Sequence, residues 1–158
     1  MSSPGSRRNQ LTQDLMVQIR YVSANSVMFS QAVAEKAGLH PTDNECLDFL
    51  MLKGPLTAGQ LSQLTGLTTG AVTAMIDRLE RAGFVQRERD QNDRRRVIVI
   101  PDREKIDVEI APFVMSMGAA TEAICAQFSE AELETILKFI TQANTVAVQE
   151  ISKLQQDK

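Results

Sequence analysis

Apolar residues recur at intervals of three and four positions in two long stretches, one near each end of the chain. This spacing puts side chains on one face of an α-helix, so it predicts long helices over residues 10–37 and 130–155. A further helix is expected over residues 103–127. The first face consists of Leu15, Ile19, Val22, Ser26, Phe29 and Val33, and the last of Leu133, Ile136, Leu137, Ile140, Val148 and Ile151.

Shorter apolar patterns between these stretches predict three more helices, over residues 42–53, 58–65 and 69–82. They would bury Leu47, Leu50, Met51, Leu61, Leu64, Val72, Ile76 and Leu79. Residues 84–89 and 95–100 are expected to form strands, joined by the turn-forming tetrapeptide Asp90-Gln91-Asn92-Asp93. The predicted fold is therefore mainly α, with about six helices and a two-stranded β-hairpin.

The ends of the predicted helices carry clear boundary residues. Four glycines stand where a left-handed residue ends a helix, namely Gly38, Gly54, Gly66 and Gly83. Three capping boxes are expected at helix starts, formed by Thr42 with Glu45, Thr57 with Gln60, and Ser129 with Glu132.

A short helix, a turn containing Gly66, a second helix and a hairpin follow one another in the order of a winged helix-turn-helix, which binds double-stranded DNA. The second helix of such a motif lies in the major groove with its N-terminal residues against base edges. Candidate DNA-facing residues here are Thr68, Thr69, Gly70, Thr73, Ala74, Asp77 and Arg78. An ordinary amphipathic helix capped by threonine is the alternative. Arg78 could equally complement the helix dipole or pair with Asp77 or Glu80.

The hairpin is rich in arginine. Its candidate DNA-contacting residues are Arg87, Arg89, Asp93, Arg94, Arg95 and Arg96. A two-stranded ribbon is thin enough to place an arginine in a minor groove, where narrow A·T-rich stretches concentrate negative potential. Asp93 would repel DNA unless it pairs with an arginine and sets its direction. A solvated edge hairpin, protected by its charges, is the alternative.

The formal net charge is −3, but the distribution of charge decides more than its total. Residues 78–96 contain seven arginines and four acidic residues, a local charge of +3, so the remaining chain carries −6. This pattern predicts an acidic body with one basic edge that faces phosphates.

The rest of the composition excludes several classes of protein. No apolar run approaches the roughly 18 residues of a membrane span, and the polar start resembles no secretory signal. We therefore expect a flexible arm at residues 1–9, a cytoplasmic protein and no membrane partner. Cys46 and Cys125 indicate neither a disulfide framework nor a metal site. A single histidine, without a phosphate loop or paired carboxylates, predicts no enzyme, metal or cofactor.

Residues 41–100 resemble the winged-helix core of the MarR family of bacterial transcriptional regulators. The resemblance is carried by GPLTAGQLSQLTGLTTGAVTAMIDRLERAGFVQRERD and the wing DQNDRRRVIVI. The Arg-Leu-Glu-x-x-Gly-Phe-Val end of the second helix and the Asp-x-x-Asp-Arg-Arg wing tip are fairly specific for that family. One departure is Pro101-Asp102-Arg103-Glu104, where many members have Leu-Thr and a later glycine.

The resemblance implies a single-domain homodimer that represses transcription from a palindromic operator until a small molecule releases it. Residues 10–40 and 103–158 would form the dimer and residues 41–102 the DNA-binding lobe. Packing of the first long helix on the last within one chain is the alternative explanation of their apolar faces. Residues 68–73 would then face the major groove. Arg94 or Arg95 would enter the minor groove, and Asp93 would match the family's wing-tip acid.

A few residues are candidates for regulation of the protein. A pocket for a small anionic aromatic effector could be lined by Tyr21, Met28, His40 and Phe49. Each of these residues also fits a core or surface role, and a local capping role is sufficient to explain His40. Cys46 could sense oxidants, or be an inert buried thiol. A winged helix that binds another protein is the rival to DNA binding, but it would not need an arginine-rich wing.

Overall fold

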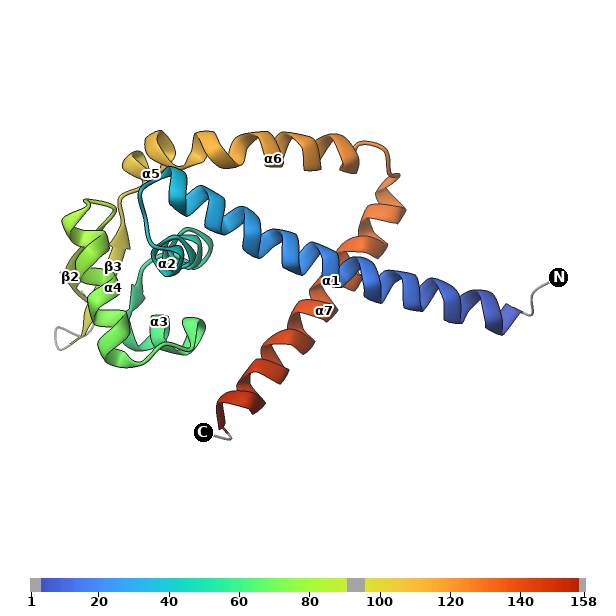
Figure 1. Ribbon diagram of the computed structural model, residues 1–158, viewed down its shortest axis with the longest axis horizontal. Coiled ribbons are helices and arrows are strands. Elements are labelled where there is room, and N and C mark those ends of the chain that lie inside the picture. The colour runs from blue at the N-terminus through green and yellow to red at the C-terminus, as the bar shows by residue number, and fades with distance from the viewer. Residues whose placement is uncertain (1–3, 91–95, 157–158) are drawn as a thin grey trace. The chain divides into compact units, whose positions relative to one another are not determined.

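The computed structural model describes residues 4–90 and 96–156, and in them the chain forms seven helices and one small antiparallel sheet (Figure 1). The elements in chain order are α1 (Pro4–Lys36), α2 (Pro41–Lys53), β1 (Leu56–Thr57), α3 (Ala58–Thr65), α4 (Thr69–Arg81), β2 (Val85–Arg89), β3 (Val97–Pro101), α5 (Arg103–Glu109), α6 (Ala111–Cys125) and α7 (Glu130–Gln156). The mainly α, winged helix-turn-helix fold predicted from the sequence is confirmed.

The chain divides into two compact units, residues 1–110 and residues 111–158. The first unit contains α1 to α5 and the sheet, and the second contains α6 and α7. The division falls eight residues after the predicted end of the DNA-binding lobe at residue 102. The grouping of residues 103–158 with residues 10–40 as dimerisation helices stays a prediction.

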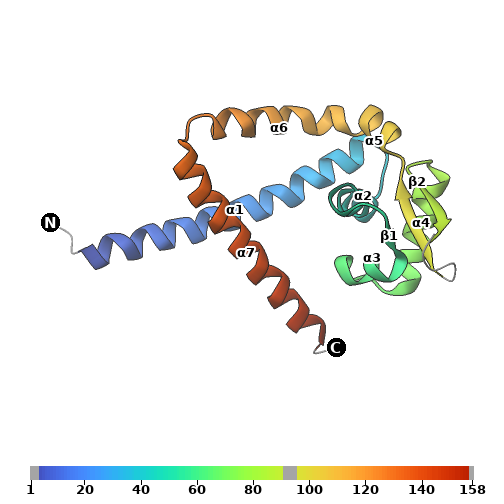
Figure 2. The same ribbon diagram turned by 180° about the vertical axis from the view of Figure 1, so that it is seen from behind.

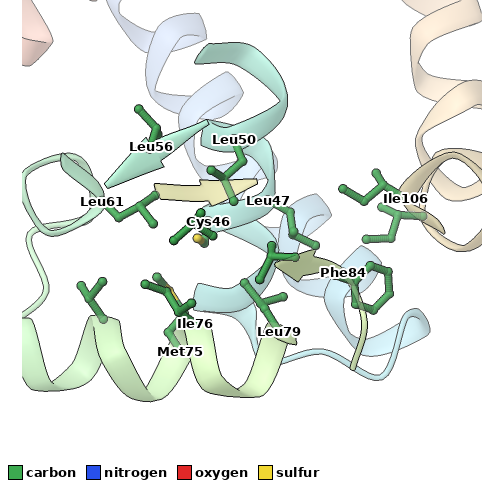
Figure 3. Packing of buried hydrophobic residues seen from close by; sticks show 14 of the residues in the cluster. Cys46, Leu47, Leu50, Leu56, Leu61, Met75, Ile76, Leu79, Phe84 and Ile106 are labelled. Atoms are coloured by element: carbon green, nitrogen blue, oxygen red, sulfur yellow. The ribbon is translucent and has the colours of Figure 1, made fainter. Parts of the chain in front are cut away.

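One apolar core holds the first unit together, with α2 at its centre (Figure 3). Side chains of α4, among them Met75, Ile76 and Leu79, point toward Cys46 and Leu47 of α2. Most of the residues that were predicted to be buried are buried in the structure, but Met51 and Leu64 are only partly buried. Met75 is fully buried, although the sequence pattern did not place it in the core. These contacts fix which face of α4 remains outside.

Local signals placed most helix ends correctly. All four predicted glycines adopt positive φ, between 67° and 82°, which other residues rarely do. The capping boxes of Thr57 with Gln60 and Ser129 with Glu132 are both present. The third prediction is wrong: α2 begins at Pro41, because a proline suits the first helical position. His40 is therefore the cap, and its Nδ1 accepts the Thr42 N–H at 3.3 Å.

Two other predictions need correction. The first helix begins at Pro4 instead of residue 10, so residues 4–9 are helical and not part of an irregular arm. The sheet has three strands in the order β1-β3-β2, not two. The added strand, β1, joins α2 to α3 (Figure 2). In the added strand Leu56 faces Val99 and Thr57 faces Ile98. Two residues are too few to show an alternating pattern, so the sequence could not reveal β1.

The expected helix over residues 103–127 is two helices, α5 and α6, which are separated at Ile110. Pro112 explains the break, since it has no N–H for the carbonyl four residues earlier and is tolerated only in the first turn of a helix. In the described ranges no single helix is long and apolar enough to cross a membrane; α5 and α6 reach that length and apolarity only when they are taken together.

Candidate nucleic-acid interface

A tight turn joins α3 to α4 in the first unit (Figure 1). Gly66 ends α3 in the left-handed conformation, and the Ser62 hydroxyl donates to the Leu67 carbonyl at 2.6 Å. Thr68 caps α4, with its hydroxyl accepting the Ala71 N–H at 3.3 Å. Because each bond lies within or next to the turn, the sequence itself sets the angle between the two helices.

The outward face of α4 begins with small and hydroxyl-bearing side chains. Thr68, Thr69, Gly70, Thr73 and Ala74 are all exposed, whereas Val72, Met75, Ile76 and Leu79 are buried. A Cβ placed on Gly70 would meet no atom within 4 Å, so packing within the chain does not require glycine there. These five candidates therefore share one open surface at the N-terminal half of α4.

Arg78 points to a partner that the sequence did not suggest. Its guanidinium donates twice to the Asp43 carboxylate of α2, from Nε to Oδ2 at 3.0 Å and from Nη2 to Oδ1 at 2.5 Å. Asp43 is 2% exposed, and its hydrogen bond to Arg78 raises the pKa of the guanidinium further. The alternative that Arg78 pairs with Asp77 or Glu80 is wrong, since its partner lies 35 positions away.

Arg87 of β2 is also bound within the chain. Its Nη2 lies 2.5 Å from Asp77 Oδ1, its Nη1 contacts Glu80, and its backbone N–H donates to Glu80 Oε1 at 3.2 Å. Both acids belong to α4, so this arginine ties the wing to the second helix of the motif. Asp77 and Arg87 were each predicted to face DNA, and in the structure they form an ion pair with one another.

Of the remaining wing candidates, the structure describes Arg89 and Arg96. Arg89 and Arg96 are exposed, and neither makes an ion pair with another described residue. The strands β2 and β3 pair from Val85 with Pro101 to Arg89 with Val97, and the Asp90 N–H donates to the Arg96 carbonyl at 2.9 Å. Asp93, Arg94 and Arg95 lie outside the described residues.

The four proposed effector residues have different environments. Tyr21 and Met28 are 61% and 67% exposed on α1, whereas Phe49 packs against the core and His40 caps α2. Tyr21 lines a hollow of about 360 Å³ along α1, together with Val17, Arg20 and Ala24. The local capping interpretation of His40 is confirmed, and the other three assignments stay predictions.

Cys46 is poorly suited to sensing oxidants. Its side chain is fully buried, and burial, together with the negative charge of Asp43, raises the pKa of its thiol to about 12. The reactive species is the thiolate, which at pH 8 is then only about one part in 10,000 of the thiol. The environment favours the inert buried thiol over the redox-sensing alternative.

A thiol-labelling experiment tests this conclusion. In a Cys125→Ser variant, in which Cys46 is the remaining thiol, we expect iodoacetamide at pH 8 to alkylate the native protein about 1,000-fold more slowly than the urea-unfolded protein, because the thiolate fraction is lower. Mass spectrometry over time measures both rates. Similar rates in the two states would show that Cys46 is accessible and ionised.

Comparison with known proteins identifies the fold. Residues 37–96 match the MarR family. The uncharacterized HTH-type transcriptional regulator YcgE of Bacillus subtilis (strain 168) is 40% identical over 149 residues, which cover 94% of this chain and 96% of YcgE. Among solved structures, a MarR family protein from Bacillus stearothermophilus is 23% identical with a TM-score of 0.66, covering 88% of this chain and 96% of its own.

A second structure of the same fold is a single-residue mutant of MepR from S. aureus, bound to an oligodeoxyribonucleotide. It is 18% identical, with a TM-score of 0.54 over 84% of this chain and 97% of its own. The winged fold and the relatives together define a DNA-binding, helix-turn-helix transcriptional regulator. The chain belongs to the MarR family. The family and its named relatives are regulators of transcription and not enzymes.

Proposed function

We propose that this regulator is a cytoplasmic homodimeric repressor that binds a palindromic operator through α4 and the wing. The open N-terminal half of α4 is the observation that carries the proposal. Its exposed side chains are small, so the helix backbone can approach base edges closely, and the first N–H groups of a helix attract phosphate. Thr68, Thr69, Gly70, Thr73 and Ala74 are the groove-facing residues of the proposal.

The wing supplies the flanking contacts. Arg89 and Arg96 are exposed and unpaired among the described residues, and Arg94 and Arg95 follow the acid at the predicted tip. We assign minor-groove or phosphate contact to these four arginines. Asp77, Arg78 and Arg87 leave the set of proposed direct contacts, because their charged groups already bind partners within the chain.

A second copy of the chain is the proposed cover for the long helices. α6 has one charged residue, Glu122, and no buried residue, although helices this apolar are normally covered on all sides. Large apolar side chains are exposed along α1 and α7, among them Leu15, Val22 and Met28, and Leu137, Ile140 and Ile151. A twofold dimer would cover such surfaces and present two copies of α4 to two half-sites.

The proposed function includes a release step that is driven by a small-molecule effector. An anionic aromatic effector near Tyr21 and Met28 would change the spacing of the two lobes and lower operator affinity. Exposure of both side chains on α1 leaves them available to a ligand or to the partner helix. Of the structures with this fold, MepR was solved with an oligodeoxyribonucleotide, which supports the DNA-binding half of the proposal.

Salt-dependent DNA binding tests the proposed function. The purified protein is used to select duplexes from a random-sequence pool, and the affinity for the selected duplex and for a scrambled one is measured at several salt concentrations. We expect selective binding. The logarithm of the association constant should fall by about one unit for each log unit of salt and each phosphate contacted. An Arg94→Ala/Arg95→Ala variant should bind more weakly, with its dimer and melting temperature unchanged. No selection from the pool by a folded dimer would favour a winged helix that binds another protein.

A further inference from the structure

Two adjacent polar residues are buried in the first turn and a half of α2. Asp43 and Asn44 are 2% and 3% exposed, and they are the buried polar residues of the described chain. All buried side-chain nitrogen and oxygen atoms in that part have hydrogen-bond partners. The two residues therefore lie in an otherwise apolar core, where each of them makes hydrogen bonds to a neighbouring helix.

The two side chains reach opposite neighbours of α2. The Asp43 carboxylate accepts two hydrogen bonds from Arg78 of α4, and the Asn44 Nδ2 donates to the Ser30 hydroxyl of α1 at 3.0 Å. Ser30 belongs to the long helix that carries exposed apolar residues, and Arg78 lies five residues after Thr73 on α4. Two neighbouring residues of α2 thus each make a separate polar contact, Asp43 with α4 and Asn44 with α1.

Stability alone does not explain a buried carboxylate at this position. The Asp43 carboxylate is buried while the side chain of Arg78 is 41% exposed. Burying a carboxylate costs desolvation that the attraction of its partner only roughly offsets, and an apolar side chain of similar volume is often as stable or more so. Crossing angles of packed helices, however, scatter by about 15–20° around their preferred values from one helix pair to another, so apolar packing alone does not specify one angle. A two-point pairing of guanidinium and carboxylate has one good geometry, so it restricts both the rotation and the tilt of α4.

We propose that Asp43 is a positioning residue for DNA recognition: by holding Arg78 at two points it fixes the orientation of α4 relative to α2 and, through Asn44 and Ser30, relative to α1. This inference rests on the proposed role of α4 as the groove-reading helix. In this proposal Arg78 contributes to recognition by pairing with Asp43, and it does not contact DNA itself. Loss of the two-point contact leaves the helix in place but lets its groove-facing residues move off their base edges.

Two substitutions test the assignment on the full-length protein and the selected duplex. Asp43→Asn keeps the size of the side chain but removes its charge. Arg78→Lys keeps the charge and a partner for Asp43 but reduces two contact points to one. For both we expect affinity for the selected duplex to fall by at least about tenfold, the value of one good base contact. Affinity for the scrambled duplex and the salt slope should not change, since no phosphate contact is lost.

Asp48→Asn is the matched control, because it removes the same charge from an exposed position of the same helix. It should bind the selected duplex like the wild type, or slightly more tightly. Circular dichroism melting and light scattering check that each variant is folded and has the wild-type mass; if Asp43→Asn does not fold, Arg78→Lys decides. Affinity at or above the wild-type value in both folded variants would overturn the proposal. A rise in the affinity of Asp43→Asn for both duplexes would also overturn it, because the released Arg78 would then contact phosphate directly.

Failure of the underlying proposed function gives a different result. If α4 does not read the groove, a Thr73→Glu variant will also keep the wild-type footprint on the selected duplex. If α4 reads the groove and Asp43 does not position it, Thr73→Glu alone will lose selectivity.

Discussion

Replacing Leu137 by glutamate is expected to turn the proposed dimer into monomers and to abolish the proposed operator binding. Leu137 lies in the N-terminal half of the apolar face of α7 and is 66% exposed in the single chain. Covering a leucine contributes about 2 kcal/mol, and an uncompensated carboxylate costs at least as much again. Because a twofold interface contains the substitution twice, the dissociation constant of the dimer should rise at least about 1,000-fold.

Sedimentation equilibrium over a range of protein concentrations measures this change. Gln142→Glu is the matched control, since it adds the same charge to a polar, exposed position on the same helix, and it should remain a dimer. A Leu137→Glu protein that stays dimeric would show that α7 lies outside the interface. A monomeric variant with a lowered melting temperature and a monomeric wild type would instead indicate packing of α7 within one chain.

Replacing Thr73 by glutamate is expected to remove sequence preference almost completely. Thr73 is exposed on α4, and its hydroxyl donates to the Thr69 carbonyl at 2.9 Å. A carboxylate at that position would approach the phosphates and base edges of the major groove without a compensating partner. The affinity of a regulator for its specific site typically exceeds its affinity for non-specific DNA by at least about 1,000-fold. We expect the variant to lose most of that difference in affinity.

The fold should not suffer from this change, because glutamate favours helix more than threonine does. Footprinting on the selected duplex, together with affinities for the selected and scrambled duplexes, gives the measurement. Gln142→Glu, far along the chain on α7, again controls for the added negative charge. An unaltered footprint with the Thr73→Glu protein would mean that the groove-reading surface is elsewhere.

Much of the fold could be predicted because its signals are local. The alternation of buried and exposed residues along α4, the capping of α3 by Thr57 and Gln60, and the left-handed Gly66 each depend on residues within one or two turns. Hydrogen bonds and backbone preferences at that range operate in the same way in any fold. The order of these elements was then sufficient to identify a winged helix-turn-helix.

The wrong predictions have identifiable reasons. Pro112 was a visible signal for the break between α5 and α6, but the apolar run around it outweighed the proline. β1 could not be seen, because a two-residue strand exists only through its pairing with β3. His40 replaced Thr42 at the start of α2 because Pro41 occupies the first helical position.

The sequence by itself determined that this protein has a helix-turn-helix with a basic hairpin, since periodicity, caps and the concentration of arginine are properties of neighbouring residues. Only the tertiary structure decided which of those arginines remain available to DNA. Arg78 is held by Asp43, which is 35 positions away, and Arg87 by two acids of α4, whereas Arg89 and Arg96 are exposed. A long-range ion pair forms only when the apolar core brings two distant segments together, so no local pattern of charges could reveal it.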